Sequence, residues 1–471
     1  MVPRSARERA GAGRVSVQGA RAVAYEVLRA VSGDEAYANL LLPHAIVRAN
    51  LDAKDAGLAT ELTYGTLRRR GTYDAIIALA ADRSVERIDP AVLDALRLGV
   101  HQLLSTRVAS HAAVNESVEL ARRHGGGKGA AGFANAVLRR VSRDTPGEWM
   151  DRIAAAARSD DERIGVTTSH PVWIVRALRR ALTAEGRADE LAELLDADNV
   201  APRVAMVALP GLAEAPDDAT AARFAPTAFT THGGGDPEGL IRASEGRIRV
   251  QDEGSQLAAL ALSRAMPVRE GERWLDLCAG PGGKTALLAA EALAHGAQLD
   301  ANEIAPARAG LVRQAVASVP LDVTVSEEDG RERAARSPEQ YDRILVDAPC
   351  TGIGALRRRP EARWRKVPSD VPDLTALQQE LVLAAFEALK PGGVVAYVTC
   401  SPHLAETSGV LAEVKRTLGD AAEELDARAV VRSVALHEID LPDQADGSLR
   451  AQLWPHRHGT DAMSIALLRK R

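Results

Sequence analysis

Apolar residues recur at three- and four-residue spacing through residues 20–145, which is the pattern of amphipathic helices. Pro90 suits the first turn of one such helix, and Asp89 precedes it as a cap. We therefore predict an all-helical domain over residues 20–145. The expected helices are Ala20–Val31, Leu58–Leu67, Thr72–Ala81, Pro90–Leu104, Asn115–Arg123 and Ala131–Val141.

From residue 251 onward, short apolar runs alternate with longer helical runs. Such alternation favours a parallel sheet with helices on both faces, so we predict an α/β domain over residues 251–471. Ligands of such sheets bind beyond the carboxyl ends of the strands. The expected strands are Arg273–Cys278, Ala297–Ile304, Leu321–Val325, Tyr341–Val346, Val394–Val398 and Met463–Leu468.

The pattern is weaker in residues 146–250, for which we predict a small α+β linker domain. It contains a loose Gly- and Pro-rich stretch from Pro210 to Gly239. The expected helices and strands are Val172–Leu182, Ala188–Asp196, Val204–Leu209 and Ile248–Val250.

The amino-acid composition adds little to this prediction of the fold. The 471 residues are 46% hydrophobic and 26% charged, as in ordinary proteins with ample core, and no apolar run is long enough to span a membrane. Residues 1–19 carry several arginines without the apolar stretch of a secretory signal, so we expect a disordered basic tail. Three cysteines do not make a disulfide framework, and a reducing cytoplasm is the expected location.

The three cysteines each stand in a short motif: Cys278 in residues 276–284, Cys350 at the end of 347–350, and Cys400 in 399–401. A lone cysteine is more often a small buried hydrophobe than a reactive group. We expect that of Cys278, which comes at a strand end beside a ligand loop. The other two motifs favour chemistry, because a thiol is partly thiolate at neutral pH and attacks electron-poor carbon.

Glycines join the first strand of the α/β domain to its helix, where a backbone can approach a ligand closely and offer free N–H groups. The phosphate-binding P-loop pattern fails because its first glycine would fall on Cys278, and the dinucleotide pattern is absent. An acidic residue also stands at or just after the end of each of four expected strands. Carboxylates accept hydrogen bonds from ribose hydroxyls and a cationic amino-acid end, so S-adenosylmethionine is the expected cofactor. Alternatively, these acids only cap loops and helices. The acids are Asp276, Glu303, Asp329 and Asp347.

The motifs that hold Asp347, Cys350 and Cys400 end neighbouring strands of the expected sheet, beside the cofactor. Two thiols and an acid next to a methyl donor suggest methylation of cytosine at C5. A thiolate adds to C6, which makes C5 able to attack the methyl group. The C5 proton then leaves and the thiol is eliminated, so the reaction needs a nucleophile, an acid and a base.

Taken together, residues 276–285, 347–352 and 397–401 resemble the motifs of RNA cytosine-5 methyltransferases. Residues 113–122 and 133–140 resemble a NusB-type RNA-binding domain. The combination resembles the bacterial RsmB/Sun family of small-subunit ribosomal RNA methyltransferases over residues 20–471. It implies a Rossmann-like methyltransferase domain that modifies a cytosine of 16S ribosomal RNA.

The resemblance also implies roles for individual residues. Cys400 is the expected nucleophile and Cys350 the residue that assists product release, with Asp347 as the third catalytic residue. The glycine loop and three later acids are the expected S-adenosylmethionine contacts. These contacts are Cys278, Ala279, Gly280, Pro281, Gly282, Gly283, Lys284, Glu303, Asp329 and Asp347.

Six basic residues and one acid follow Cys350 within residues 356–366, and they would bring phosphate-binding charge to the active site. A charge run can also be only a solvated face. Aromatic residues make up 3% of the chain, so binding mainly by base stacking is not expected. The expected RNA contacts are Arg357, Arg358, Arg359, Arg363, Trp364, Arg365 and Lys366.

Two other functions fit parts of this pattern. A DNA cytosine-5 methyltransferase would use Cys350 as nucleophile, and a non-catalytic RNA-binding or antitermination factor would use the helical domain alone. We favour the RNA methyltransferase, acting on small-subunit ribosomal RNA as a monomer without a membrane or a metal. His456 and His458 have no matching ligand cluster in the sequence, so no metal site is predicted.

Overall fold

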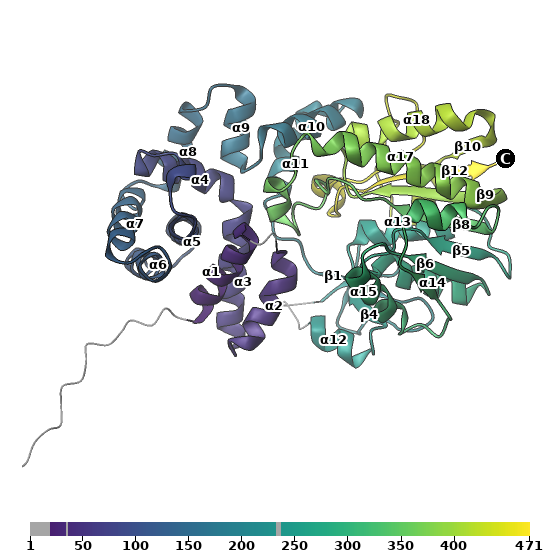
Figure 1. Ribbon diagram of the computed structural model, residues 1–471, viewed down its shortest axis with the longest axis horizontal. Coiled ribbons are helices and arrows are strands. Elements are labelled where there is room, and N and C mark those ends of the chain that lie inside the picture. The colour runs from purple at the N-terminus through teal and green to yellow at the C-terminus, as the bar shows by residue number, and fades with distance from the viewer. Residues whose placement is uncertain (1–18, 34–35, 232–236) are drawn as a thin grey trace, which may run out of the picture. The chain divides into compact units, whose positions relative to one another are not determined.

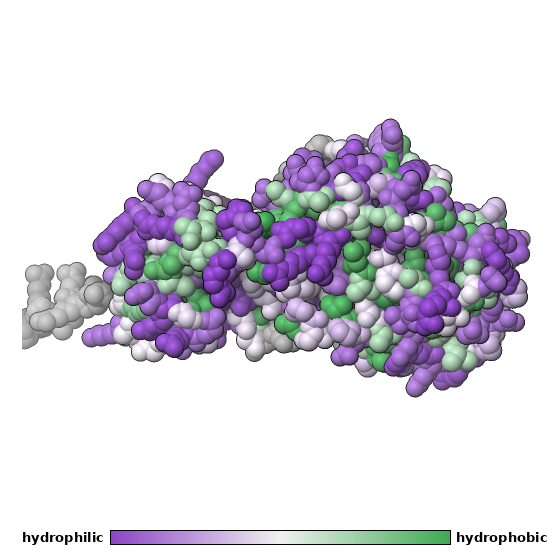
Figure 2. Space-filling view, turned by 90° about the horizontal axis from the view of Figure 1, so that it is seen from above, coloured by the Kyte–Doolittle hydropathy of each residue, from purple (hydrophilic) through white to green (hydrophobic). Residues whose placement is uncertain are grey.

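A computed structural model describes residues 19–33, 36–231 and 237–471 of the protein (Figure 1). The chain divides into two compact units, Met1–Ser169 and His170–Arg471. The expected basic tail lies outside the described residues, apart from Gly19. Within the described ranges, no helix is long and apolar enough to cross a membrane. Hydrophilic side chains cover most of the face shown in Figure 2, with apolar ones in scattered patches.

The regular elements among the described residues of the first unit are all helices, as the three- and four-residue spacing predicts. Asp89 caps its central helix, since its carboxylate accepts hydrogen bonds from the backbone N–H groups of Ala91 and Val92. Buried Leu96 and Leu138 lie in the core that these helices share. The helices are α1 (Gly19–Gly33), α2 (Ala38–Arg48), α3 (Ala53–Arg68), α4 (Arg70–Ala81), α5 (Pro90–Ser105), α6 (Ser110–His124), α7 (Lys128–Val141), α8 (Pro146–Ala155) and α9 (Asp160–Thr168).

The second unit opens with helices and a small antiparallel sheet of order β2-β3-β1-β4. The domain boundaries predicted at residues 145 and 250 stay predictions. Helices α8 and α9, which follow residue 145, belong to the first unit, and the small sheet belongs to the second. The elements are α10 (Val172–Ala184), α11 (Leu191–Ala197), β1 (Ala205–Ala208), β2 (Thr220–Ala221), β3 (Ala228–Thr230), α12 (Pro237–Ala243) and β4 (Ile248–Val250).

A large sheet of order β10-β12-β9-β8-β5-β6-β7 follows, and its central strands β5 to β9 are parallel. The predicted parallel sheet is present at the centre, but the sheet is mixed, because β12 and β10 run antiparallel at one edge. A short buried apolar run carries no sign of its direction, so the sequence pattern does not distinguish the two pairings. The strands are β5 (Arg273–Asp276), β6 (Gln298–Asn302), β7 (Thr324–Ser326), β8 (Tyr341–Asp347), β9 (Leu389–Thr399), β10 (Ala422–Leu425), β11 (Ala451–Gln452) and β12 (Ser464–Lys470).

Helices cover both faces of this sheet. Alternate strand residues such as Leu275 and Ile344 pack with α16, α17 and α18 on one face. Their neighbours Trp274 and Leu345 pack with α13, α14 and α19 on the other. The helices are α13 (Glu253–Ser263), α14 (Gly283–Ala294), α15 (Pro306–Val316), α16 (Gly330–Ala335), α17 (Asp370–Ala388), α18 (Ser408–Leu418), α19 (Ala427–Val434) and α20 (Pro455–His458).

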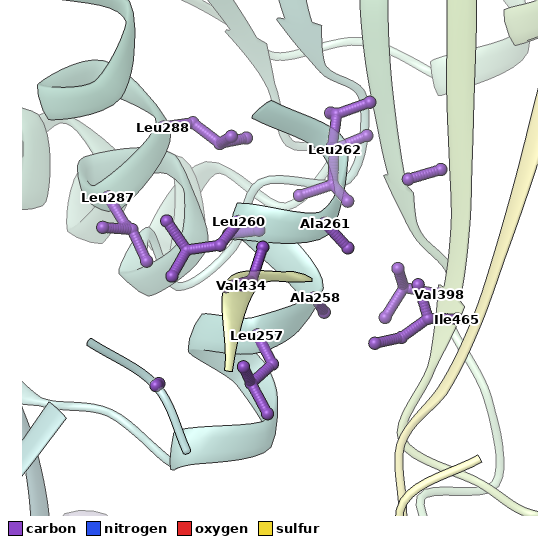
Figure 3. Packing of buried hydrophobic residues seen from close by; sticks show 14 of the residues in the cluster. Leu257, Ala258, Leu260, Ala261, Leu262, Leu287, Leu288, Val398, Val434 and Ile465 are labelled. Carbon is purple, nitrogen blue, oxygen red and sulfur yellow. The ribbon is translucent and has the colours of Figure 1, made fainter. Parts of the chain in front are cut away.

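Helix α13 forms the centre of the larger core. In Figure 3, Leu260 of α13 lies toward Leu287 of α14, whereas Ala258 faces Val398 of β9 and Ile465 of β12. The small side chain of Ala258 lets the helix approach the strands closely. Because both faces of the sheet are filled in this way, polar chemistry is confined to the edge where the parallel strands end.

Candidate active site at the carboxyl edge of the sheet

The structure brings Cys350 and Cys400 together. Strands β8 and β9 are parallel neighbours, Cys400 directly follows β9, and Cys350 comes three residues after Asp347 ends β8. The two Sγ atoms are 3.4 Å apart, within hydrogen-bonding distance for sulfur, and both cysteines are free. As whole residues both cysteines are only partly buried.

The two thiols are not equivalent. The hydrogen bond with Cys350 lowers the pKa of Cys400. It outweighs burial and the negative charge of Asp347, which raise that pKa, and the positive charges of Arg359 and Lys284 lower it further. The same hydrogen bond, and then burial, raise the pKa of Cys350 well above its ordinary value. The arrangement therefore favours a Cys400 thiolate that accepts a hydrogen bond from the Cys350 thiol.

Cys278 differs from this pair. Burial, followed by the negative charges of Asp276 and Asp347, raises its pKa strongly. It packs beside the core of α17 and α18. Its thiol therefore stays protonated and unreactive, in keeping with the strand-end role expected from the sequence.

Lys284 and Asp347 form an ion pair beside the thiols. The Nζ atom of Lys284 donates to Oδ2 of Asp347 at 2.8 Å. Burial lowers the pKa of Lys284, but the charge and hydrogen bond of Asp347 more than offset it, and the net shift is upward. The lysine therefore remains a cation near Cys400.

The glycine loop is held by Glu303. Its Oε2 accepts the N–H of Gly280 at 3.1 Å, and its Oε1 accepts the N–H of Ala305 at 2.9 Å. A Cβ atom at position 280 would lie 2.1 Å from Oε2, so a side chain there would displace the carboxylate. Gly282 has a φ of +103° and precedes α14, a conformation that glycine adopts without strain.

Asp276 lies below this loop, with its side chain buried. Thr285 donates its hydroxyl to Oδ2 of Asp276 at 2.7 Å. Burial, and to a lesser degree the charge of Asp347, raise the pKa of Asp276 to about 7. Its second oxygen, Oδ1, is buried and has no hydrogen-bond partner within the described chain. The remaining predicted acid, Asp329, caps α16 by accepting the N–H of Arg331 at 2.9 Å, and the hydrogen bond from the Arg331 side chain lowers its pKa.

Two polar residues of this edge were not found from the sequence. The Asn302 side chain ties three strand ends together, donating to the carbonyls of Leu277 and Glu328 and accepting the hydroxyl of Ser326. The Gln251 amide is buried against Gly283, and within the described residues neither of its polar side-chain atoms has a partner. Neither residue stands in a recognisable motif.

The basic segment after Cys350 is built differently from the expected open surface. Arg357 is buried, with a guanidinium nitrogen 3.6 Å from both Asp252 and Asp461. Arg358 donates from Nε to Asp461 at 2.9 Å. These ion pairs hold the segment against the start of α13 and the last loop before β12. The predicted RNA role of Arg357 is therefore withdrawn, because its charge is already matched inside the protein.

Arg363 is also withdrawn from the predicted RNA contacts. It is completely buried and donates to the Asn199 side chain and the Asp198 carbonyl, both at 2.8 Å. Arg359 is exposed, and its charge acts on Cys400. Arg365, Lys366 and Trp364 are partly exposed. Within the described ranges, no group of three or more His, Cys, Asp or Glu residues is arranged to hold a metal ion.

Comparison with known proteins identifies two matching families. The 16S rRNA methyltransferase RsmB/F family matches residues 263–469, and the NusB family matches residues 18–143. A candidate methyltransferase of Mycobacterium tuberculosis is 45% identical over the full length of both chains. The ribosomal RNA small subunit methyltransferase B of Pseudomonas putida is 34% identical over 86% of this chain and 91% of its own.

The fold is shared with a solved structure. The crystal structure of PH0851 matches with a TM-score of 0.79 at 21% identity, covering 97% of this chain and 99% of that one. A methyltransferase homologue from Pyrococcus horikoshii matches with a TM-score of 0.52 at 21% identity, over 65% of this chain and 98% of its own.

The unequal thiols give a first prediction. Cys350→Ala removes the hydrogen-bond donor, so the pKa of Cys400 should rise. Since only the thiolate reacts with iodoacetamide, alkylation of Cys400 at pH 7 should slow about tenfold, as expected for loss of a charge-assisted hydrogen bond. Peptide mass spectrometry over a pH series measures this. Cys278→Ser serves as the control and should leave the profile unchanged. An unaltered Cys400 profile in Cys350→Ala would show that the pair is not coupled.

Proposed function

The chain belongs to the RsmB/F family of 16S rRNA methyltransferases, and from that premise we propose that it methylates C5 of a cytosine in small-subunit ribosomal RNA through a covalent adduct. The observation that carries the proposal is the asymmetric pair of Cys400 and Cys350, with Sγ atoms 3.4 Å apart. A methyltransferase that acts on oxygen or nitrogen needs no thiolate. Methylation at cytosine C5 needs a nucleophile to activate the carbon.

We propose that Cys400 adds to C6 of the target cytosine. Its thiolate forms the S–C6 bond, and the electron pair released from the C5–C6 double bond makes C5 the nucleophile for the methyl group. In this proposal Asp347 holds the N3 side of the base as the adduct forms; its pairing with Lys284 supports this role. Water then takes the C5 proton, and the electron pair of the C5–H bond restores the C5–C6 double bond and expels the Cys400 sulfur as a thiolate. Cys350 lies beside that sulfur and assists its release.

We propose S-adenosylmethionine as the cofactor, held by the loop Cys278–Lys284 and by Glu303, Asp329 and Asp347. When bound, it supplies the methyl group. The residues at this edge suit such a ligand. The start of α14 offers backbone N–H groups, and the buried Gln251 amide beside it can both donate and accept. The unpartnered Oδ1 of Asp276 and the carboxylate of Glu303 are further acceptors at the same loop.

The two rival functions fit these observations less well. A DNA-type mechanism would make Cys350 the nucleophile, yet the hydrogen bond and burial raise its pKa, which favours the unreactive thiol. A non-catalytic RNA-binding factor has no use for a lowered pKa at Cys400. We further propose that the protein acts in the cytoplasm as a monomer, with ribosomal RNA as its partner.

The cofactor assignment is tested at Glu303. Glu303→Ala should weaken S-adenosylmethionine binding about 10- to 150-fold, because a charged hydrogen bond typically contributes about 1.5–3 kcal/mol. Isothermal titration calorimetry gives the affinity, and thermal unfolding checks that the variant is folded. Glu327→Ala changes a nearby acid that pairs with Arg313 instead, and it should bind normally. An unchanged affinity in a folded Glu303 variant would refute the assignment.

RNA binding is tested at the exposed part of the basic segment. Replacing Arg359 and Lys366 together by Ala should lower the log–log salt slope of RNA binding by about 1.4–1.8, if each contacts one phosphate. Filter binding of a 16S rRNA transcript from low to moderate salt measures the slope. The matched control replaces Lys415 and Arg416 of α18, which pair with Glu424 and Glu413. Equal slopes in both double variants would mean that the segment is only a solvated face.

The division of labour between the thiols is tested on a denaturing gel after incubation with cofactor and RNA. Cys400→Ser should lose activity and form no adduct, since a hydroxyl is a far weaker nucleophile. Cys350→Ala should attack and transfer the methyl group but release RNA slowly, which leaves a slow-migrating protein–RNA band. A band in Cys400→Ser instead would exchange the roles. Full activity in both variants would exclude the covalent mechanism.

A further inference from the structure

The carboxylate of Glu406 joins the two loops that carry the cysteines. Its Oε1 accepts the backbone N–H of Thr351 at 2.7 Å. Its Oε2 accepts the hydroxyl of Thr351 at 2.5 Å and that of Ser401 at 2.7 Å. Thr351 directly follows Cys350 and Ser401 directly follows Cys400, so one side chain fixes the position of both thiols.

Glu406 is completely buried. An ionised carboxylate has no donor of its own, so its position depends on the donors that surround it. The two hydroxyl oxygens also lie 3.0 Å apart, so Thr351 Oγ1, Ser401 Oγ and Glu406 Oε2 form one compact cluster. A buried charge is kept in a protein only when such bonds compensate the loss of water. The arrangement therefore holds one defined spacing between the loops.

A second layer holds Glu406 and the Cys350 loop from α17 and β9. Gln378 donates to the carbonyl of Pro349 at 2.8 Å and to Glu406 Oε1 at 3.2 Å. The Tyr397 hydroxyl donates to the backbone carbonyl of Glu406, and its oxygen also lies 3.1 Å from Gln378 Oε1. Gln378 comes from a helix packed against the sheet and Tyr397 from a strand within it. The residue before Cys350 and the residue after it are thus both tied to the same network.

We propose that Glu406 is the positioning residue of the active site, which sets the contact between the Cys350 and Cys400 sulfurs without touching the substrate. This inference rests on the proposed function, in which those two sulfurs take part in the reaction. A shift of about 1 Å in reacting groups can cost about 100-fold in rate, so a fixed spacing is part of the catalytic machinery.

The charge of Glu406 has a second effect. After the hydrogen bond to Cys400 and burial, it is a further cause of the raised pKa of Cys350. The carboxylate thus helps to keep Cys350 protonated, as the donor to Cys400. A purely structural side chain of the same shape would lack this effect, and that difference separates the two roles experimentally.

The test uses the full chain with Glu406→Gln and Glu406→Ala. Glu406→Gln keeps the shape and removes the charge, so in the absence of RNA the share of iodoacetamide label on Cys350 relative to Cys400 should rise severalfold near neutral pH. Glu406→Ala should lower kcat for methyl transfer to 16S rRNA about 100-fold with little change in KM. Glu291→Gln is the matched control, because Glu291 is also buried and accepts a serine hydroxyl, from Ser263 at 2.8 Å, away from the cysteine loops.

The outcomes are distinct. The proposal is overturned if Glu406→Gln divides the iodoacetamide label between Cys350 and Cys400 as the unaltered protein and Glu291→Gln do. This holds whether or not Glu406→Ala folds. A shifted distribution in Glu406→Gln supports the positioning role even if the unaltered protein transfers no methyl group to RNA. A failure of the unaltered protein to transfer a methyl group to RNA would reject the proposed function instead.

Discussion

The hydrogen bond between Cys350 and Cys400 is the interaction on which the proposed function of this protein depends. Two thiols that share one proton cannot have the same reactivity, and the surroundings decide which of them is the thiolate. The hydrogen bond itself lowers the pKa of Cys400 against burial and the charge of Asp347, and Arg359 and Lys284 lower it further, while Glu406 raises the pKa of Cys350. The proposed division of roles rests on these different surroundings, since the two residues are chemically identical.

The sheet supplies the geometry for that pair. Strands β8 and β9 are parallel neighbours, so the loops after Asp347 and Thr399 leave the same edge side by side. Helices fill both faces, which leaves this edge as the place where polar groups can gather. The glycine loop before α14 lies at the end of the next strand, β5, and Lys284 reaches Asp347 from it. Cys400, Asp347 and the glycine loop therefore meet because three adjacent strands end together.

Much of this edge was predictable because its residues are local in sequence. Strand, glycine loop and helix lie within one stretch, and the motifs of Cys350 and Cys400 each follow a buried strand. Contacts between distant segments were not predictable. Arg357 and Arg363 look like solvated cations in the sequence, but they are buried against acids and carbonyls from segments more than a hundred residues earlier. Glu406 is likewise inconspicuous until the fold brings Thr351 to it, and the antiparallel direction of β12 leaves no mark on its apolar run.

The central claim, that Cys400 is the nucleophile, is tested most directly by trapping the adduct on the unaltered protein. A 16S rRNA transcript containing 5-fluorocytidine, incubated with the protein and S-adenosylmethionine, should accept the methyl group but not complete elimination, because fluorine cannot leave C5 as a proton does. Peptide mapping of the trapped complex should then find the nucleotide on Cys400. A nucleotide on Cys350, or no covalent complex at all, would contradict this account.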